Sequence, residues 1–242
     1  MEYGVTGLIL NDYGNNADDI DRRMQALMDL PKATYIEDAR QTFDPQTVVS
    51  VDMHEGGVTL PDAQFPALGT MALATCLGVM AYNPQTKATG LCHVVSEGIE
   101  SYPSAASQAS LTAMLNKVKN GMDTHVEVRL VGAHIGGDLQ NGMINNVVDF
   151  LSNYDAVILS ADIKGKPGPS AVAVDANRWG DGLIRGKVDA IDIRKNPDAM
   201  VDQIKQARTC VDLDNMVHLA DNGKDLVYDA TAIRSYDLDV TL

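Results

Sequence analysis

Two residues of this sequence, Cys76 and His93, carry side chains that together could attack a carbonyl carbon. Cys76 lies in the apolar run Met71 to Tyr82, His93 lies in the next run, Ala88 to Val95, and a turn at Asn83-Pro84 separates the two. Two strands folded at this turn would place the thiol and the imidazole across from each other. An imidazolium stabilises the reactive thiolate, and the imidazole can pass a proton to a leaving amine. The pattern therefore predicts a Cys-His pair, and the alternative is a core cysteine, because free cysteines are among the most buried residues.

The residues around this pair resemble the CheD family of chemoreceptor glutamine deamidases, in which a threonine, a cysteine and a histidine follow at fixed spacing. Five residues separate Thr70 from Cys76, and sixteen separate Cys76 from His93, as in the family motif. Farther along, Val126 to Ala133 is similar to a family strand that ends in a Gly-Gly-Ala turn. Four further landmarks follow in the family's order: Asn146-Val147, Asp162-Ile163, Gly165 and Gly168. The resemblance spans residues 66–180.

This resemblance implies a CheD-like fold, related to the catalytic domain of cytotoxic necrotizing factor toxins, and hydrolysis of a glutamine side-chain amide within a protein. By position, Cys76 is then the nucleophile, His93 the general acid/base, and Thr70 the hydroxyl that orients the imidazole. The thiolate attacks the carboxamide carbon, the imidazole protonates the departing ammonia, and water cleaves the thioester to leave glutamate. Such a cysteine-dependent amidohydrolase needs neither a metal nor a cofactor. The backbone N–H of Cys76 or of a neighbour is expected to bind the oxyanion.

Departures from the family pattern bear on the substrate. The family has Gly-Ser before its cysteine where this chain has Ala74-Thr75, and Leu-Pro after its histidine where this chain has Val94 to Glu97. Near its C-terminal strands the family has Gly-Gly and then Gly-Arg, where this chain has Lys164-Gly165 and Gly168-Pro169. The family's arginine is therefore absent from this position. The expected substrate is a chemoreceptor or another signalling protein, or a host protein if the chain is a toxin-like effector. Transfer of the glutamine acyl group to an amine is a variant of the same chemistry.

An alternative from a different class is a non-catalytic adaptor that keeps the fold and binds a signalling partner, as CheD proteins also bind the CheC family of phosphatases. The altered rim at Val94 to Glu97 motivates this alternative. Thiol reactivity separates the two hypotheses, because a paired thiolate alkylates fast and an inert core cysteine does not. Because all three catalytic residue types are retained, an enzyme is favoured over an adaptor. The expected partners are a protein that presents a glutamine and a CheC-like regulator.

The elements that must position these residues form an α+β pattern. Short apolar runs predict strands at residues 5–10, 47–60, 71–82, 88–95, 126–131, 156–160, 171–174 and 183–193, with Gly56 and Gly57 in a turn. Helical spacing predicts helices from Asn16 to Pro31, over 105–120 with Gly121 left-handed at its end, over 143–151, and from Asn196-Pro197 onward. The mixture favours CheD-like mixed β-sandwich or sheet layers flanked by helices over a doubly wound parallel sheet.

Three segments are expected along the chain, together forming one compact unit. They are an N-terminal α/β extension packed on the core (1–65), the CheD-like catalytic core (66–180) and a C-terminal extension (181–242).

Composition excludes several classes of function. The 242 residues include 19 Lys+Arg and 33 Asp+Glu, which gives a net charge of −14. Nucleic acid is not expected as a partner, because an acidic chain is repelled by phosphates. No segment approaches the ~18 apolar residues of a membrane span, and the first residues lack a signal-peptide pattern. We therefore expect no membrane insertion and a cytoplasmic location, with export by a route that needs no N-terminal signal as the alternative.

The remaining chemically active side chains are expected to be structural. Cys92 adjoins His93, so its side chain should lie on the opposite face of the strand, in the core. The alternative is that Cys92 is a redox partner of Cys76. His134 is expected in a strand-to-helix turn, because it has too few neighbours for a metal site. The other histidines, His54, His125 and His218, are expected in loops or at the surface. Asp18, Asp19 and Asp21 are expected in the first turn of a helix, where acidic side chains favour the positive end of the helix dipole. Cys76, Cys92 and Cys210 lack CxxC spacing, so no disulfide framework or zinc site is expected.

Overall fold

The computed structural model describes residues 7–10, 17–38, 43–44, 47–61, 63, 65–97, 102–121, 123–134, 138–164 and 171–187. Several predictions fall outside these residues: the helix cap at Asn16, the glycines at 165 and 168, the helix from Asn196, and the side chains of Cys210 and His218.

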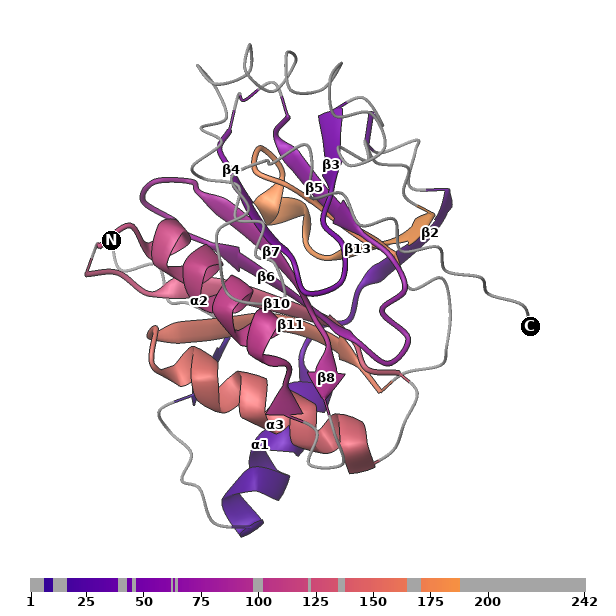
Figure 1. Cartoon of the computed structure of the whole chain (residues 1–242), viewed down its shortest axis with the longest axis vertical. Coiled ribbons are helices and arrows are strands. Elements are labelled where there is room, and N and C mark those ends of the chain that lie inside the picture. The colour runs from indigo at the N-terminus through magenta and orange to yellow at the C-terminus, as the bar shows by residue number, and fades with distance from the viewer. Residues whose placement is uncertain are drawn as a thin grey trace.

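A six-stranded sheet forms the centre of the fold (Figure 1). Its strands, in spatial order, are β1 (Leu8–Ile9), β11 (Ala156–Ile163), β10 (Val126–Gly132), β6 (Leu77–Tyr82), β7 (Thr89–Val94) and β4 (Gly56–Thr59). β10 and β11 pair in parallel, and the other neighbours are antiparallel. Parallel strands need a long crossover, which the helix between β10 and β11 supplies.

A five-stranded sheet packs on one face of the six-stranded sheet. Its order is β2 (Thr34–Asp38), β13 (Ile184–Lys187), β12 (Val172–Asp175), β5 (Ala67–Thr70) and β3 (Val48–Ser50). A separate two-stranded ladder joins β8 (Ser96–Glu97) to β9 (Tyr102–Pro103). Strands from outside residues 66–180 are thus hydrogen-bonded to strands within it, with β3 on β5, β4 on β7 and β13 on β12.

Three helices cover the other face of the six-stranded sheet (Figure 1). They are α1 (Ala17–Asp29), α2 (Ala105–Lys119) and α3 (Asp138–Ser152). At the start of α2, the Ser104 side chain accepts a hydrogen bond from the Ser107 N–H, which caps the helix. Asn120 and Gly121 both have positive φ at its end, so the predicted left-handed conformation of Gly121 is confirmed.

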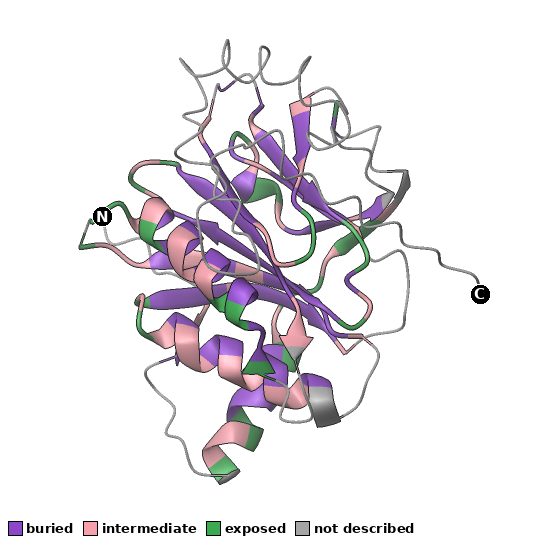
Figure 2. Cartoon of the chain, in the orientation of Figure 1, coloured by how far each residue is buried: buried purple, intermediate pink, exposed green. Residues whose placement is uncertain are grey.

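The alternation of side chains along β6 and β7 separates two cores. Leu77 and Cys92 face the helices, whereas Met80 and Leu91 face the five-stranded sheet. Both strands are buried throughout, and Figure 2 shows them as purple ribbons, whereas the helices carry pink and green patches of intermediate and exposed residues. Layers of helices, sheet and sheet confirm the prediction of an α+β fold with sheet layers flanked by helices.

Side chains tie the two sheets together at both ends of their interface. At one end Trp179, in the 3₁₀ turn Trp179–Asp181, stacks on Tyr82 of β6 with ring centroids 5.0 Å apart and donates to Glu127 of β10 at 2.6 Å. At the other end Arg185 of β13 forms an ion pair with Asp162 of β11 at 3.1 Å. These ties hold the sheets in a fixed relation, on which a site between them depends.

One local prediction is wrong, because Gly56 and Gly57 lie in β4 and not in a turn. A Cβ at Gly56 would lie 3.1 Å from the Ser110 carbonyl oxygen, and one at Gly57 would lie 3.3 Å from Leu68. The two glycines therefore let β4 fit closely between α2 and β5. The turn lies just before them, at Met53-His54.

Candidate active site

Cys76 lies immediately before β6, at the end of the loop that leaves β5. The predicted strand over residues 71–82 has Cys76 near its middle. In the structure residues 73–76 form a turn, and the strand begins at Leu77. The side chain of Cys76 is 7% exposed and belongs to the core between the two sheets. The thiol is thus nearly buried at the edge of the sheet interface.

The turn between β6 and β7 sets the register that brings His93 close to Cys76. Asn83 shapes this turn: its Oδ1 accepts hydrogen bonds from the N–H groups of Gln85 and Thr86, and its Nδ2 donates to a carbonyl of α2. In the resulting register His93 lies opposite Gly78, two residues beyond Cys76. Because side chains two residues apart share a face, the thiol and the imidazole lie on the same side of the sheet.

Thr70 approaches the imidazole from the other sheet. It is the last residue of β5, is 3% exposed, and its Oγ1 lies 2.8 Å from His93 Nδ1. The structure therefore brings Thr70 and His93 together across the two sheets. This hydrogen bond fixes the ring orientation and leaves the second ring nitrogen, Nε2, for another partner.

No hydrogen bond from any described residue reaches that second nitrogen, and this includes the Cys76 thiol. His93 is 1% exposed, so Nε2 is a buried polar atom without a partner. The thiol instead forms a hydrogen bond with Thr75 Oγ1, at 3.9 Å. A buried unsatisfied nitrogen is costly for folding, and such atoms call for an explanation such as a catalytic role.

Burial sets the charge of the imidazole. It lowers the pKa of His93 to about 4, an effect to which His54 adds and which the carboxylates of Asp52 and Glu55 partly offset. The imidazole is therefore neutral around pH 7. A neutral ring whose Nδ1–H donates to Thr70 presents a lone pair at Nε2 and can accept a proton there.

Burial also raises the pKa of the Cys76 thiol, and the hydrogen bond with Thr75 offsets part of this effect. Both groups thus favour their neutral forms, whereas sequence reasoning expected a thiolate stabilised by an imidazolium. The difference arises because strands of the second sheet cover both groups and exclude water. In such a site an imidazole can serve as a general base for a thiol.

The turn before β4 holds the backbone of His93 on both sides. The His93 N–H donates to the Glu55 carbonyl at 2.9 Å, and its carbonyl accepts from the His54 N–H at 3.1 Å. The His54 ring also lies 2.7 Å from Ser104 Oγ and within reach of Ser107 Oγ at 3.2 Å. His54 is therefore a half-buried link between this turn and α2. About fifty residues separate the partners, and no sequence signal indicates the link.

The other candidates of the sequence lie elsewhere. Cys92 is fully buried on the helix side of the six-stranded sheet, which confirms its predicted place in the core. His134 follows β10, as predicted, and its Nε2 lies 3.0 Å from Nη1 of Arg185. Across the described ranges, no group of three or more histidine, cysteine or acidic side chains could hold a metal ion.

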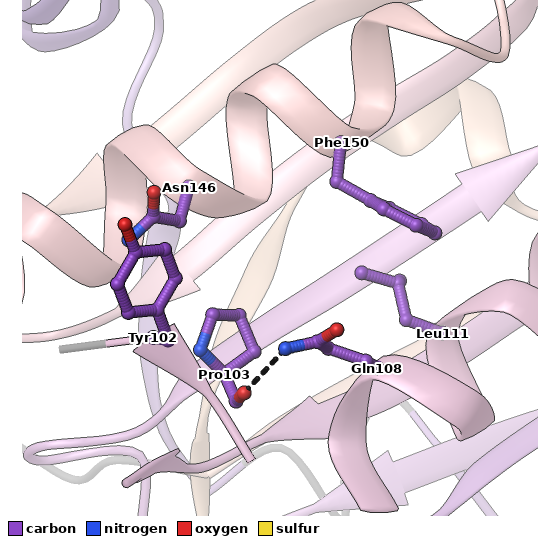
Figure 3. A pocket seen from close by; sticks show the side chains of 6 residues that line it. All are labelled: Tyr102, Pro103, Gln108, Leu111, Asn146 and Phe150. Carbon is purple, nitrogen blue, oxygen red and sulfur yellow. Dashed lines mark hydrogen bonds between the residues drawn. The ribbon is translucent and has the colours of Figure 1, made fainter. Parts of the chain in front are cut away.

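A hollow on the helix side is separate from the cysteine. It has a volume of about 140 Å³ and lies between the β9 end and helices α2 and α3 (Figure 3). Gln108 donates to the Pro103 carbonyl at its edge, and Asn146 and Phe150 of α3 line its other side. Asn146 therefore lies on the opposite side of the sheet from Cys76.

No protein-family model and no curated protein matches this sequence. Within the described part of the chain, no helix has both the length and the apolar character that crossing a membrane requires.

Proposed function

We propose that this protein is a cysteine-dependent amidohydrolase that deamidates a glutamine side chain within a protein. The observation that carries the proposal is the 2.8 Å contact between Thr70 and His93, on the face of the sheet that also carries Cys76. These three residues are the ones that the CheD resemblance assigns to catalysis. A buried neutral imidazole whose Nε2 has no hydrogen-bond partner among the described residues, on the same face as a thiol, suits the transfer of a proton in both directions.

In the proposed reaction His93 Nε2 takes the thiol proton as Cys76 Sγ attacks the carboxamide carbon. The proton then passes to the amide nitrogen, the C–N bond breaks, and ammonia leaves a thioester on Cys76. Water then gives a proton to His93 Nε2 and attacks the thioester carbon. The C–S bond breaks, the thiol regains its proton, and the substrate side chain becomes glutamate. Thr70 holds the ring in place throughout.

Substrate and location follow from the resemblance and the composition. The proposed substrate is a chemoreceptor or another signalling or host protein, and a CheC-like regulator is a proposed partner. The proposed site of action is the cytoplasm.

Ammonia release tests the proposal. Denatured casein and the dipeptide carbobenzoxy-glutaminyl-glycine serve as probes, and peptide mass spectrometry locates glutamate formed from glutamine. The Cys76→Ser variant should lose activity by at least about 10³-fold, because an alcohol is a far weaker nucleophile here than a thiol. The matched control is Cys92→Ala, which should remain active. Equal activity of Cys76→Ser and the unaltered chain contradicts the proposal.

A non-catalytic adaptor is the second candidate function. The observation that favours it is that the Cys76 thiol is not hydrogen-bonded to His93 Nε2, together with the raised pKa of that thiol. Absence of ammonia release from both probes, together with slow alkylation of Cys76 that His93→Ala leaves unchanged, supports this candidate.

A further inference from the structure

The loop that carries Cys76 is fastened to the end of β10 by Gly132, the last residue of that strand, and by Ala133, which follows it. The Ala133 N–H donates to the carbonyl oxygen of Cys76 at 2.7 Å and to that of Leu73 at 3.2 Å. Leu73 and Cys76 are the first and last residues of the turn that precedes β6. A single donor therefore holds both ends of this loop.

Gly132 makes this close approach possible. Its φ of +115° lies in a region that residues with a Cβ rarely adopt. A Cβ at this position would overlap the carbonyl oxygen of Cys76 and would lie 2.9 Å from that of Leu73. It would also lie 3.1 Å from Leu73 Cβ, so its three nearest contacts are all with the cysteine loop. Any side chain at residue 132 must displace the loop or the end of β10.

The loop is also anchored from the side that faces His93. Leu73 is fully buried in the core between the sheets. A Cβ at Gly78, the residue opposite His93, would lie 3.0 Å from Leu73 Cδ1. Leu73 thus fills the space next to Gly78, which lies opposite His93. A shift of the loop must therefore change the position of the thiol relative to the imidazole.

We infer that Gly132 and Ala133 are positioning residues for the Cys76 nucleophile. The backbone of β10, and not a side chain, sets where the thiol lies relative to His93. The catalytic consequence rests on the proposed function, whereas the fixed position of the thiol does not. A displacement of about 1 Å in an active site lowers turnover by roughly 10²-fold.

The test compares Gly132→Ala with two matched glycine variants. Gly121→Ala (φ +67°) and Gly182→Ala (φ +86°) also place a Cβ on a residue with positive φ, but these Cβ atoms would meet no neighbour closer than 3.9 Å. Iodoacetamide alkylation of Cys76 and Cys92 is followed by peptide mass spectrometry in the full chain, beside ammonia release from carbobenzoxy-glutaminyl-glycine.

In Gly132→Ala the displaced thiol should alkylate about tenfold faster, because local opening exposes it, while Cys92 stays unreactive. The value of kcat should fall by roughly 10²-fold with KM little changed. The two control variants should match the unaltered chain in both measurements. Faster alkylation combined with slower turnover distinguishes a misplaced nucleophile from a general loss of reactivity.

A folded Gly132→Ala variant whose Cys76 alkylates at the unaltered rate overturns the inference. Reactive Cys92 in that variant indicates global unfolding, and amide hydrogen exchange at Ala133 in the unaltered chain then decides. Slow exchange supports the inference, and exchange as fast as that of an exposed amide overturns it. If the unaltered chain releases no ammonia but Gly132→Ala alkylates selectively faster, the proposed deamidation fails and the positioning of the thiol stands.

Discussion

Cys76, just before β6, and Cys92, in the neighbouring strand β7, lie on opposite faces of the six-stranded sheet. Cys92 packs in the apolar core between the six-stranded sheet and the helices, and burial strongly raises its pKa. Cys76 is almost as buried, yet its face also carries His93 and Thr70. Burial therefore does not separate an inert cysteine from a candidate nucleophile.

The polar neighbours separate the two cysteines. A hydrogen bond between Thr70 and His93 inside an apolar interface leaves His93 Nε2 unsatisfied, a cost that the Cys92 side chain itself does not incur. An apolar pair at these two positions would stabilise the sheet interface without that cost. The Cys76 face thus has the composition of a site at which chemistry outweighs stability.

The largest expected loss of activity that tests this contrast between the two faces comes from removing the His93 imidazole. His93→Ala removes the general base and should lower ammonia release by about 10³-fold, within the usual range for general acid–base catalysis. The matched control is His134→Ala, which alters a histidine that contacts Arg185 and should keep most of the activity. Initial rates with carbobenzoxy-glutaminyl-glycine measure both. Equal losses in the two variants would indicate a structural and not a chemical role for His93.

The rates at which Cys76 and Cys92 are alkylated test the contrast between the two faces without any substrate. At pH 8 iodoacetamide should modify Cys76 at least about 100-fold faster than Cys92, because Cys92 reacts only when the core opens. The rate at Cys76 should keep rising with pH beyond ~9, since burial raises the pKa of this thiol. Quantitative peptide mass spectrometry over a time course gives both rates. Similar rates at the two cysteines contradict the distinction between the faces.

Much of this contrast could be predicted from local sequence. The turn at Asn83-Pro84 and the period of two along a strand place Cys92 and His93 on opposite faces, and the structure confirms both. These features depend on residues that are close in the chain. For the same reason, the three helices within the described residues could be predicted from their apolar spacing and the glycine at the end of α2.

The environment of the site could not be predicted in the same way. Thr70 reaches His93 only because β5 pairs with β3 and β12 in a second sheet, and these pairings join distant parts of the chain. That sheet also buries the imidazole, which is why the charge expected for it was wrong. The contact between Gly132 and the cysteine loop depends on a backbone approach that carries no residue pattern of its own.

The charge of the imidazole gives the next largest effect. A histidine with a pKa near 6.5 is only ~3% neutral at pH 5, whereas one with a pKa of about 4 is ~90% neutral. Because the neutral form is the base, activity should persist at pH 5 and fall as the pH drops toward 4. Ammonia release between pH 3 and pH 8, with circular dichroism to verify folding, measures this. An acid limb near pH 6.5 would mean that water reaches the imidazole.

A carboxylate variant tests the cause of that pH dependence. Asp52 raises the pKa of His93, so Asp52→Asn should move the acid limb to lower pH. Asn can still accept the Met53 N–H through its side-chain oxygen, as Asp52 does at 2.8 Å. Asp123→Asn, at the far end of β10, is the matched control and should leave the limb in place.

The smallest expected effect on activity concerns the hydroxyl that joins the two sheets. Thr70→Val keeps the shape of the side chain but removes the hydrogen bond to His93 Nδ1, and should lower kcat by about tenfold, the equivalent of a hydrogen bond of roughly 1.4 kcal/mol. Thr70→Ser keeps the hydroxyl and should restore most of the rate. The effect should fall on kcat and not on KM, because the ring and not the substrate loses its support. Equal rates for the valine and serine variants would mean that packing between the sheets orients the imidazole, and the Cys76 face would then resemble the Cys92 face more closely than its polar residues indicate.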